Sequence, residues 1–194
     1  MLLGLTGGIG CGKSTAACMF EQFGFRRIDA DALVREEILP DPAVIARIRE
    51  RFGPTVVTAA GTIDRPRLAD MVFVDDAARQ WLEELIHPQV RARWQARVQT
   101  APEAAWVIEI PLLFEKGLEN WFDFVVCVSC APDLQLARLE RRGLARELAV
   151  QRISKQLPLA RKIELSDFVL SNDGTTDFLR EQISHLVTRI GVTR

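Results

Sequence analysis

The chain has 194 residues, of which 48% are apolar and 26% charged, and its formal net charge at pH 7 is −1. This length suffices for one well-buried domain with inserted segments, and the near-neutral charge argues against a large nucleic-acid-binding surface. No apolar stretch approaches the roughly 20 residues that cross a membrane, and the apolar N-terminus reads as a core strand instead of a secretory signal. We therefore expect a cytoplasmic protein that binds neither nucleic acid nor membranes.

The first predicted element is a short strand at Leu2–Leu5, which leads into a glycine-rich loop. The loop, Gly7–Ser14, reads Gly-Gly-Ile-Gly-Cys-Gly-Lys-Ser and fits the phosphate-binding pattern G-x-x-x-x-G-K-[ST]. In that pattern backbone N–H groups surround the phosphates, the lysine bridges them and the hydroxyl holds Mg²⁺. A helix predicted over about residues 13–22 directs the positive end of its dipole at the same phosphates.

Two carboxylates follow the second predicted strand, Phe25–Ile28. Asp29 and Asp31 would lie at the C-terminal end of this strand, where open α/β sheets bind ligands. A Rossmann dinucleotide fold would also place a ribose-binding acid about here, but the loop lacks that fold's third small residue. For Asp29, capping the next helix is as good an interpretation as a direct role in function.

Helical patterns replace the strand–helix alternation from about residue 40 to residue 100. The segment therefore reads as an insertion that completes a substrate pocket over the sheet edge. His87 stands before Pro88, where a boundary between two helices is expected and a structural role outweighs a catalytic one. The helices are predicted at Pro42–Phe52, Pro66–Phe73, Asp76–Ile86 and Pro88–Gln99.

The third predicted strand, Trp106–Ile110, is an apolar run that carries an acid near its exit. Glu109 occupies the position of a Walker B carboxylate, which would support Mg²⁺. Because an unpaired acid in a buried strand is costly, we favour this role over a chance occurrence. The loop Pro111–Glu115 comes next at the same edge of the sheet, where Glu115 could equally be solvent-exposed.

A fourth strand is predicted at Phe124–Ser129, and a helix with Asp133 as its N-cap follows. Cys127 and Cys130 read as small buried apolar residues, because no second Cys/His pair exists that would complete a zinc site. The chain closes with a fifth strand at Phe168–Leu170 and a final amphipathic helix.

A dense basic segment lies between the last two predicted strands. A run of charges is often only a solvated helix face. In a phosphate-loop protein, however, phosphoryl transfer needs cations that close over the transferring group, so we interpret the segment as a lid. Its basic residues are Arg138, Arg141, Arg142, Arg146, Arg152, Lys155, Arg161 and Lys162.

Six motifs occur in a fixed order along the chain: Leu5–Thr15, Ile28–Asp31 with Arg35, Gly61–Arg65, His87-Pro88, Pro111–Glu115 and Asp167–Gly174. Together they resemble the dephospho-coenzyme A kinase family over essentially the whole chain. The resemblance implies ATP-dependent phosphorylation of the ribose 3′-hydroxyl of dephospho-coenzyme A, the last step of coenzyme A synthesis, with Mg²⁺ as cofactor.

The resemblance also implies an α/β fold of the P-loop kinase type, a three-layer sandwich around a parallel five-stranded sheet. The single kinase domain would comprise a core at about residues 1–39, 101–137 and 166–194. A helical acceptor-binding insertion would cover about residues 40–100, and a lid would cover about residues 138–165.

Site roles follow from the same resemblance. Asp31 would be the base at the acceptor hydroxyl. The phosphate-loop pattern and the Walker B position of Glu109 already predict that Lys13 acts on the phosphates and that Ser14 with Glu109 holds Mg²⁺. Either Arg141 or Arg142 would contact the transferring group, and the choice stays open because Gly143 stands where the family has Asp or Asn. The ATP-binding residues would be Gly10, Cys11, Gly12, Lys13, Ser14, Thr15, Asn172 and Gly174. The acceptor-binding residues would be Asp31, Arg35, His87, Pro111, Leu112, Leu113 and Glu115.

Two other functions share part of this pattern. A GTPase-like switch would need a guanine-reading Asn-Lys-x-Asp, yet neither Asn120 nor Asn172 is followed by Lys. A kinase for another small metabolite would share the fold and most of the chemistry, and only the acceptor-side motifs argue against it. We therefore predict a small-molecule kinase whose partners are ATP and dephospho-coenzyme A, as a monomer or weak homo-oligomer.

Overall fold

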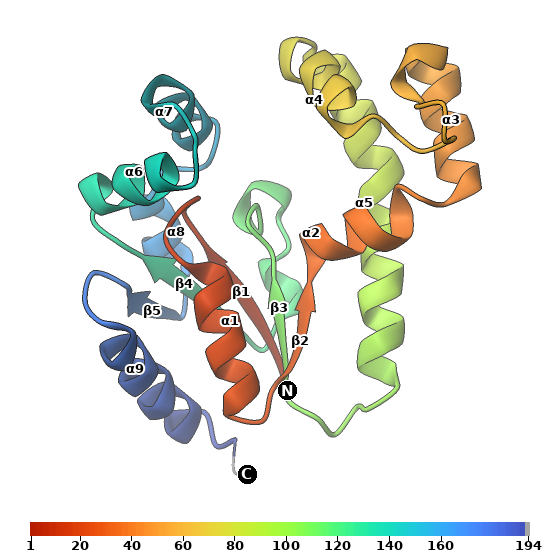
Figure 1. Ribbon diagram of the computed structural model, residues 1–194. Helices are drawn as coiled ribbons and strands as arrows, with labels where there is room; N and C mark the ends of the chain where they lie inside the picture. The colour runs from red at the N-terminus through yellow and green to blue at the C-terminus, as the bar shows by residue number, and fades with distance from the viewer. Residues whose placement is uncertain (193–194) are drawn as a thin grey trace. The chain divides into compact units, whose positions relative to one another are not determined.

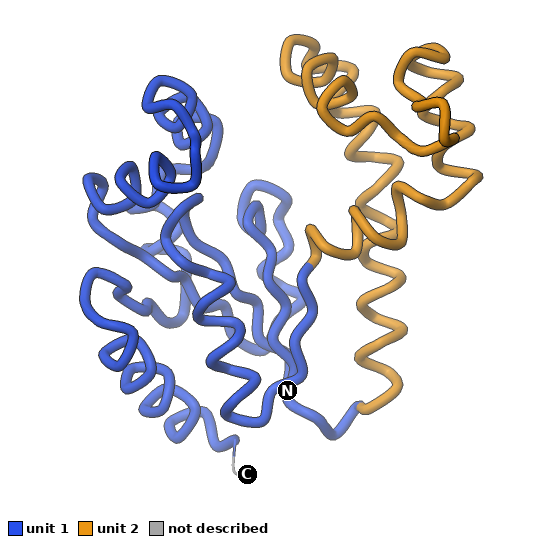
Figure 2. The backbone as a smooth tube through the Cα atoms, viewed as in Figure 1, with its two compact units in different colours: residues 1–29, 102–194 blue, residues 30–101 orange. Residues whose placement is uncertain are grey.

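The computed structural model describes residues 1–192, which divide into two compact units (Figure 2). The first unit contains residues 1–29 and the chain from residue 102 onward, and it holds the β-sheet. The second unit, residues 30–101, is built from helices. The predicted insertion at about residues 40–100 falls inside this second unit.

The first unit is organised around a five-stranded parallel sheet with the strand order β2-β3-β1-β4-β5 (Figure 1). The sheet confirms the predicted α/β class and strand count. Apolar runs form its central strands, rich in leucine in β1 and in β-branched residues in β3 and β4, as expected where both faces are covered. The strands are β1 (Leu2–Gly7), β2 (Arg26–Asp29), β3 (Trp106–Glu109), β4 (Phe124–Ser129) and β5 (Phe168–Ser171).

Helices cover both faces of this sheet. Phe20 of α1 and Leu179 and Ile183 of α9 are fully buried in one core with alternate side chains of β1, β3 and β4. Helix α8 packs against β1 and β4 and covers the other face (Figure 1). The helices are α1 (Lys13–Gln22), α6 (Pro132–Arg141), α7 (Arg146–Ser154), α8 (Leu159–Leu165) and α9 (Thr176–Arg189), with short 3-10 turns η3 (Phe114–Lys116) and η4 (Glu119–Trp121).

The second unit has a core of its own. Ile38, Val44, Ile48 and Leu68 are buried in it. Aspartates cap three of its helices by accepting backbone N–H bonds, which is the usual way to satisfy the first turn. Its elements are α2 (Ala30–Leu33), the π-helical η1 (Val34–Ile38), α3 (Pro42–Phe52), the 3-10 turn η2 (Pro54–Val56), α4 (Arg65–Val74) and α5 (Asp76–Gln99).

The predicted helix boundary at His87 is wrong, because α5 continues through Pro88 as one helix. Proline removes one backbone donor and crowds the carbonyl of the preceding turn. The side chain of Gln89, the residue after the proline, donates to the Leu85 carbonyl at 3.0 Å. Buried residues on both sides of the proline, Ile86 and Trp94, keep the two halves in line.

The predicted N-cap at Asp133 is also wrong. Helix α6 begins at Pro132, its N-cap position is Ala131, and no side chain caps it. Proline is well suited to this first position because its missing N–H needs no partner there. Among residues 1–192, no helix combines the length and the apolar character that crossing a bilayer requires.

Candidate active site

The phosphate loop, Gly7–Ser14, connects the end of β1 with the first turn of α1. Gly10 and Gly12 both adopt positive φ, at 80° and 95°. A Cβ on Gly12 would lie 2.2 Å from the Nδ2 atom of Asn172, so the position requires glycine for both reasons. The loop therefore brings its backbone around the N-terminus of a helix, which is an anion-binding arrangement.

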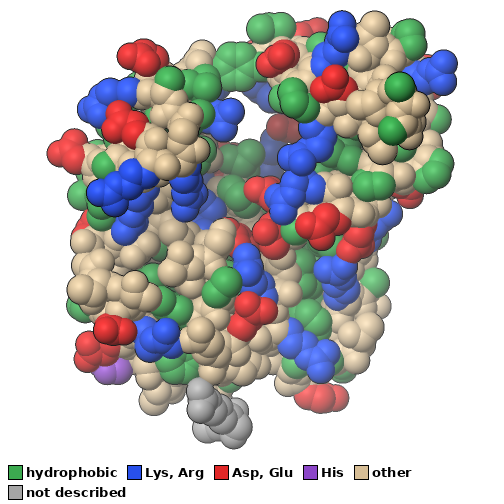
Figure 3. Space-filling model, viewed as in Figure 1, with side chains coloured by type: hydrophobic (Ala, Val, Ile, Leu, Met, Phe, Trp, Pro, Cys, Tyr) green, Lys and Arg blue, Asp and Glu red, His purple; other side chains and the backbone are tan. Residues whose placement is uncertain are grey.

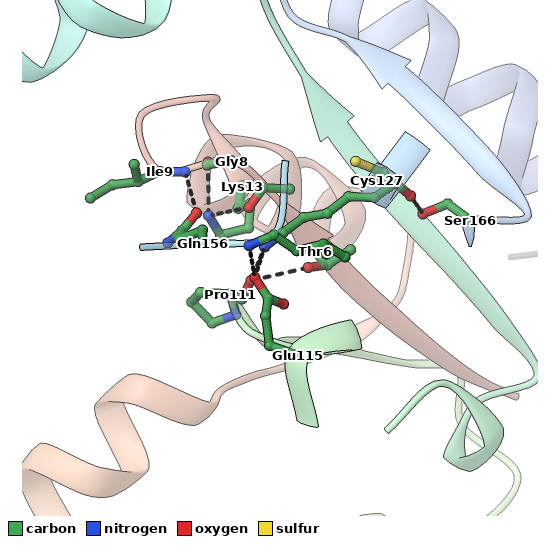
Figure 4. Close-up of polar contacts among 12 residues, drawn as sticks. Thr6, Gly8, Ile9, Lys13, Pro111, Glu115, Cys127, Gln156 and Ser166 are labelled. Carbon is green, nitrogen blue, oxygen red and sulfur yellow. Dashed lines mark hydrogen bonds and ion pairs between the residues drawn. The ribbon is translucent and has the colours of Figure 1, made fainter. Parts of the chain in front are cut away.

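Lys13 is held against the backbone of this loop. Its Nζ donates to the carbonyl oxygen of Gly7 at 3.2 Å and to that of Gly8 at 3.0 Å (Figure 4). The residue is 8% exposed, so the loop and not the solvent sets the position of the ammonium group. A cation in this place can bridge the phosphates of a nucleotide.

Ser14, Glu109 and Arg27 form a hydrogen-bonded chain beside the loop. Ser14 Oγ donates to Glu109 Oε1 at 2.8 Å, and Arg27 donates to Glu109 Oε2 at 3.2 Å. The parallel register pairs Glu109 with Leu5 on one side and Asp29 on the other, at the edge of the sheet from which the loop departs. Arg27 was missed from the sequence, although strand alternation places it on the same face of β2 as Asp29.

Asn172 connects the end of β5 to the loop. Its Nδ2 donates to the carbonyl oxygen of Cys11 at 2.8 Å, and its own carbonyl accepts from Arg138 at 2.9 Å. Gly174 lies on the exposed turn that follows, and Thr15 is exposed in the first turn of α1. The turn after β5, which is predicted to lie at the adenine end of the ATP site, is thus in direct contact with the phosphate loop.

The loop that follows β3 is anchored by a buried ion pair. Lys162 is fully buried, and its Nζ lies 2.8 Å from both Glu115 Oε1 and the Pro111 carbonyl oxygen. The same carboxylate oxygen accepts from the Leu157 N–H at 2.9 Å, and Thr6 donates to the Pro111 carbonyl at 3.3 Å (Figure 4). These bonds hold the loop in one position next to β1.

The alternative interpretation of Glu115 as a solvent-exposed residue is therefore wrong, because its side chain is only 17% exposed. Leu113 is fully buried, whereas Pro111 and Leu112 are half-buried. Pro111 and Leu112 are therefore partly accessible to solvent, while Leu113 and Glu115 anchor the loop.

Helix α6 ends at Arg141, and Arg142 follows as its C-cap; both side chains are exposed. Gly143 has φ of 82°, and its N–H donates to the Glu140 carbonyl at 2.9 Å while the next N–H returns to Leu139 at 3.2 Å. This pair of bonds is a Schellman motif, in which glycine is the favoured residue and Asn the second choice. The Schellman motif therefore explains a glycine at position 143, where the family pattern has Asp or Asn.

The basic residues of the segment 138–165 are not all surface charges. Lysine and arginine side chains gather on the surface over α6 and α7 (Figure 3). Arg138 instead donates to the Asn172 backbone, and Lys162 is buried in the anchor described above. The interpretation of a solvated face therefore fails for these two residues, and the assignment of residues 138–165 to a lid stays a prediction.

The remaining predicted acceptor residues lie in the second unit. Asp31 is exposed in the short helix α2, which begins directly after β2. Arg35 follows in η1, where it is exposed and its guanidinium lies 3.8 Å from Glu36. His87 is exposed in the middle of α5.

The family model described as dephospho-CoA kinase matches residues 1–177 of this chain. The chain belongs to the dephospho-CoA kinase family. The dephospho-CoA kinase of Gloeobacter violaceus is 41% identical over 192 residues, which cover 98% of this chain and 93% of the relative. That of Geobacillus kaustophilus is 40% identical over 188 residues, which cover 94% of this chain and 93% of the relative.

Solved structures agree with this membership. The dephospho-CoA kinase from Campylobacter jejuni superposes with a TM-score of 0.72 at 27% identity, covering 97% of this chain and 96% of that one. The protein TT1252 from Thermus thermophilus superposes with a TM-score of 0.81 at 31% identity, covering 99% and 98%. Shikimate kinase from Acinetobacter baumannii, at 17% identity and a TM-score of 0.57, shares the fold alone.

Membership confirms several predictions made from the sequence. The chain has the P-loop kinase fold, and its family consists of ATP- and Mg²⁺-dependent kinases that act on dephospho-coenzyme A in the last step of coenzyme A synthesis. The GTPase-like switch and the kinase for an unrelated metabolite are therefore no longer competing interpretations.

The residues beside the loop fit the Mg²⁺ that such a dephospho-CoA kinase needs. Within residues 1–192 no cluster of three or more His, Cys, Asp or Glu side chains could hold a metal alone. Mg²⁺ does not require such a cage, since it commonly takes one or two protein oxygens and completes its shell with phosphate oxygens and water. The hydroxyl of Ser14 and the carboxylate of Glu109, 2.8 Å apart, supply oxygens of the right kind.

Proposed function

We propose that this chain transfers the γ-phosphoryl group of ATP to the ribose 3′-hydroxyl of dephospho-coenzyme A through the residues identified above. The observation that carries the proposal is the joint placement of Lys13, Ser14 and Glu109 around one phosphate loop. Phosphoryl transfer depends mainly on positioning and on offsetting spread negative charge, and this arrangement provides both.

On the donor side, Gly10–Thr15 surround the phosphates with backbone N–H groups and the N-terminus of α1. Lys13 moves from the loop carbonyls to the β- and γ-phosphates, and Ser14 with Glu109 would hold Mg²⁺. Bound Mg²⁺ would neutralise charge on the same phosphates. Asn172 and Gly174 border the adenine end of the site.

On the acceptor side, Asp31 orients the attacking hydroxyl and accepts its proton. Its side chain is exposed in the first turn of α2, and a carboxylate is a suitable group to accept a hydroxyl proton. Arg35, His87 and the half-buried Pro111 and Leu112 bind the rest of dephospho-coenzyme A. Leu113 and Glu115 support that surface from inside the loop.

The segment of residues 138–165 acts as a lid over the donor. Arg141 and Arg142 are both exposed and lie where α6 turns at Gly143, so a change at this turn would redirect either side chain. Closure of the lid excludes water, which would otherwise accept the phosphoryl group. We further infer that the protein works in the cytoplasm, as a monomer or weak homo-oligomer.

Incubation with ATP, Mg²⁺ and a panel of hydroxyl acceptors tests the proposal. ADP release should depend on dephospho-coenzyme A and should be negligible with shikimate, nucleosides or no acceptor. Equal ADP release without any acceptor would indicate an ATPase or a switch. A preference for another acceptor would show that the acceptor-side residues have been assigned to the wrong substrate.

A further inference from the structure

Two thiols meet beside the phosphate loop. Cys11 lies within the loop, and Cys130 follows the last residue of β4. Their sulfur atoms are 3.4 Å apart, and Cys130 Sγ donates to Cys11 Sγ. Cys11 is 0% exposed and Cys130 is 5% exposed. The interpretation of Cys130 as a small buried apolar residue therefore leaves out its direct contact with Cys11.

The surroundings favour one thiolate and one thiol in this pair. The hydrogen bond from Cys130 lowers the pKa of Cys11 from its ordinary value of 9.0 to about 7; burial opposes this shift and the Lys13 ammonium assists it. The same hydrogen bond raises the pKa of Cys130, with burial adding to the effect and the charges of Arg138 and Asp173 opposing each other. Thiolates, not thiols, attack oxidants and disulfides.

The other two cysteines lack this combination. Burial raises the pKa of Cys127 to about 11, and its side chain alternates away from the core that holds Cys11. Cys18 is exposed on α1, where it accepts a hydrogen bond from Arg27, and it has no thiol partner at hydrogen-bond distance among the contacts of the described residues. The chain thus carries its own matched controls.

We propose that Cys11 and Cys130 are a modification site for small hydroperoxides and form a reversible disulfide that blocks nucleotide binding. The Cys11 thiolate attacks one oxygen of hydrogen peroxide, giving a sulfenic acid and hydroxide. The Cys130 sulfur then attacks the Cys11 sulfur, forming the S–S bond and releasing water. Two thiols and one peroxide yield one disulfide and two waters, so two electrons pass from sulfur to oxygen.

The disulfide would change the shape of the loop. An S–S bond is about 2.05 Å long, so the sulfurs must approach by roughly 1.3 Å from their present 3.4 Å. Gly10 and Gly12 flank Cys11 with positive φ, and Asn172 holds its carbonyl, so the backbone at Cys11 cannot shift alone. Movement of Cys11 toward β4 would therefore displace the N–H groups that surround the phosphates.

The experiment uses the full chain, reduced and then freed of reductant. Treatment with hydrogen peroxide at pH 7 should weaken binding of a fluorescent ATP analogue by about tenfold or more, as expected when a hydrogen bond to a charged phosphate is lost. The free-thiol count should fall from four to two, peptide mass spectrometry should show Cys11 linked to Cys130, and dithiothreitol should restore binding. ATP present during treatment should slow the reaction, because bound phosphates hold the loop.

Variants distinguish this mechanism from general oxidation. Cys130→Ala should bind the analogue before treatment as the wild type does and should resist peroxide, because it lacks both the second thiol and the hydrogen bond that favours the Cys11 thiolate. Cys130→Ser should bind the analogue equally well and should form no linked peptide. Cys18→Ser, the matched control, should lose binding as fast as the wild type. Absence of the linked peptide, or equal loss of binding in the Cys130 variants, would overturn the proposal. None of these readouts involves dephospho-coenzyme A, so the result is independent of the acceptor assignment.

Discussion

Glu109, at the end of β3, and Glu115, in the loop that follows, are carboxylates with different surroundings. Glu109 is 7% exposed and shares its two oxygens between the Ser14 hydroxyl and Arg27, whose side chain is 21% exposed. Glu115 is 17% exposed, and its Oε1 meets the fully buried Lys162, while its Oε2 is buried with no hydrogen-bond partner. The first carboxylate touches the phosphate loop; the second anchors a loop to a helix.

The two carboxylates differ in whether their partner, Ser14 or Lys162, can exchange the carboxylate for another group. The hydroxyl of Ser14 can exchange its carboxylate for a metal ion or a phosphate without leaving a buried charge behind. Lys162 is fully buried, so losing Glu115 would leave its ammonium group in the core without a counter-charge, which is strongly destabilising. The comparison predicts that changes near Glu109 alter catalysis and that changes near Glu115 alter stability.

The largest effect is expected at the loop itself. Lys13→Ala should lower kcat by about 10³-fold or more, because the cation that offsets phosphate charge is lost. The midpoint of thermal unfolding without nucleotide should change little, since the Lys13 ammonium is bound to carbonyls of the loop itself. Steady-state kinetics and a melting curve check both parts, and near-normal turnover would show that the phosphate loop has been misassigned.

A second rate effect is expected at Asp31. Asp31→Asn keeps the size and hydrogen-bonding reach of the side chain but removes the charge that accepts the hydroxyl proton, so kcat should fall by about 10²–10⁴-fold with an unchanged KM for ATP. Asp29→Asn is the matched control in the same segment. A greater rate loss at Asp29 would mean that the wrong carboxylate has been named.

The buried anchor should respond in stability. Lys162→Met leaves Glu115 buried without its cation and should lower the free energy of unfolding by about 3–5 kcal/mol, measured by urea denaturation. The adjacent Arg161→Met is the control, because Arg161 pairs with Glu164 at the surface, where both side chains are 57% exposed, and such pairs contribute little. Equal small losses from both variants would contradict the contrast between the two regions.

The smallest effect is expected at Glu109, the carboxylate beside the phosphate loop. Glu109→Gln should raise the Mg²⁺ concentration that gives half-maximal turnover by about tenfold, because a charged oxygen ligand is replaced by a neutral amide oxygen. The unfolding midpoint should move little, since Arg27 retains access to solvent and to Asp29. An unaltered Mg²⁺ requirement together with a large loss of stability would make Glu109 a second structural anchor.

Strong local signals made much of the fold predictable. The apolar run into a glycine-rich loop predicted α1 at residues 13–22, and the β-branched run predicted β4 at Phe124–Ser129; both bounds agree with the structure. Pro88 was misread because a local helix-breaking signal was overruled by packing on both sides of it. Local patterns therefore sufficed where they agreed with the tertiary structure.

Contacts between distant parts of the chain could not be predicted in the same way. The motifs named Ser14 and Glu109, but nothing local showed that Arg27 would hold the far oxygen of Glu109 or that Lys162, within a basic run, would be buried. The Cys11–Cys130 contact joins residues 119 positions apart. Such pairings depend on strand order, which a single sequence does not specify.

The position of the new phosphate group in the product tests the central claim most directly. The protein is incubated with ATP, Mg²⁺ and dephospho-coenzyme A, and the product is analysed by ³¹P NMR and mass spectrometry. We predict one ADP for each coenzyme A formed, with the new phosphate monoester on the ribose 3′-oxygen. A phosphate at another hydroxyl, or ATP consumption without any phosphorylated acceptor, would contradict the assignment of this chain's active site.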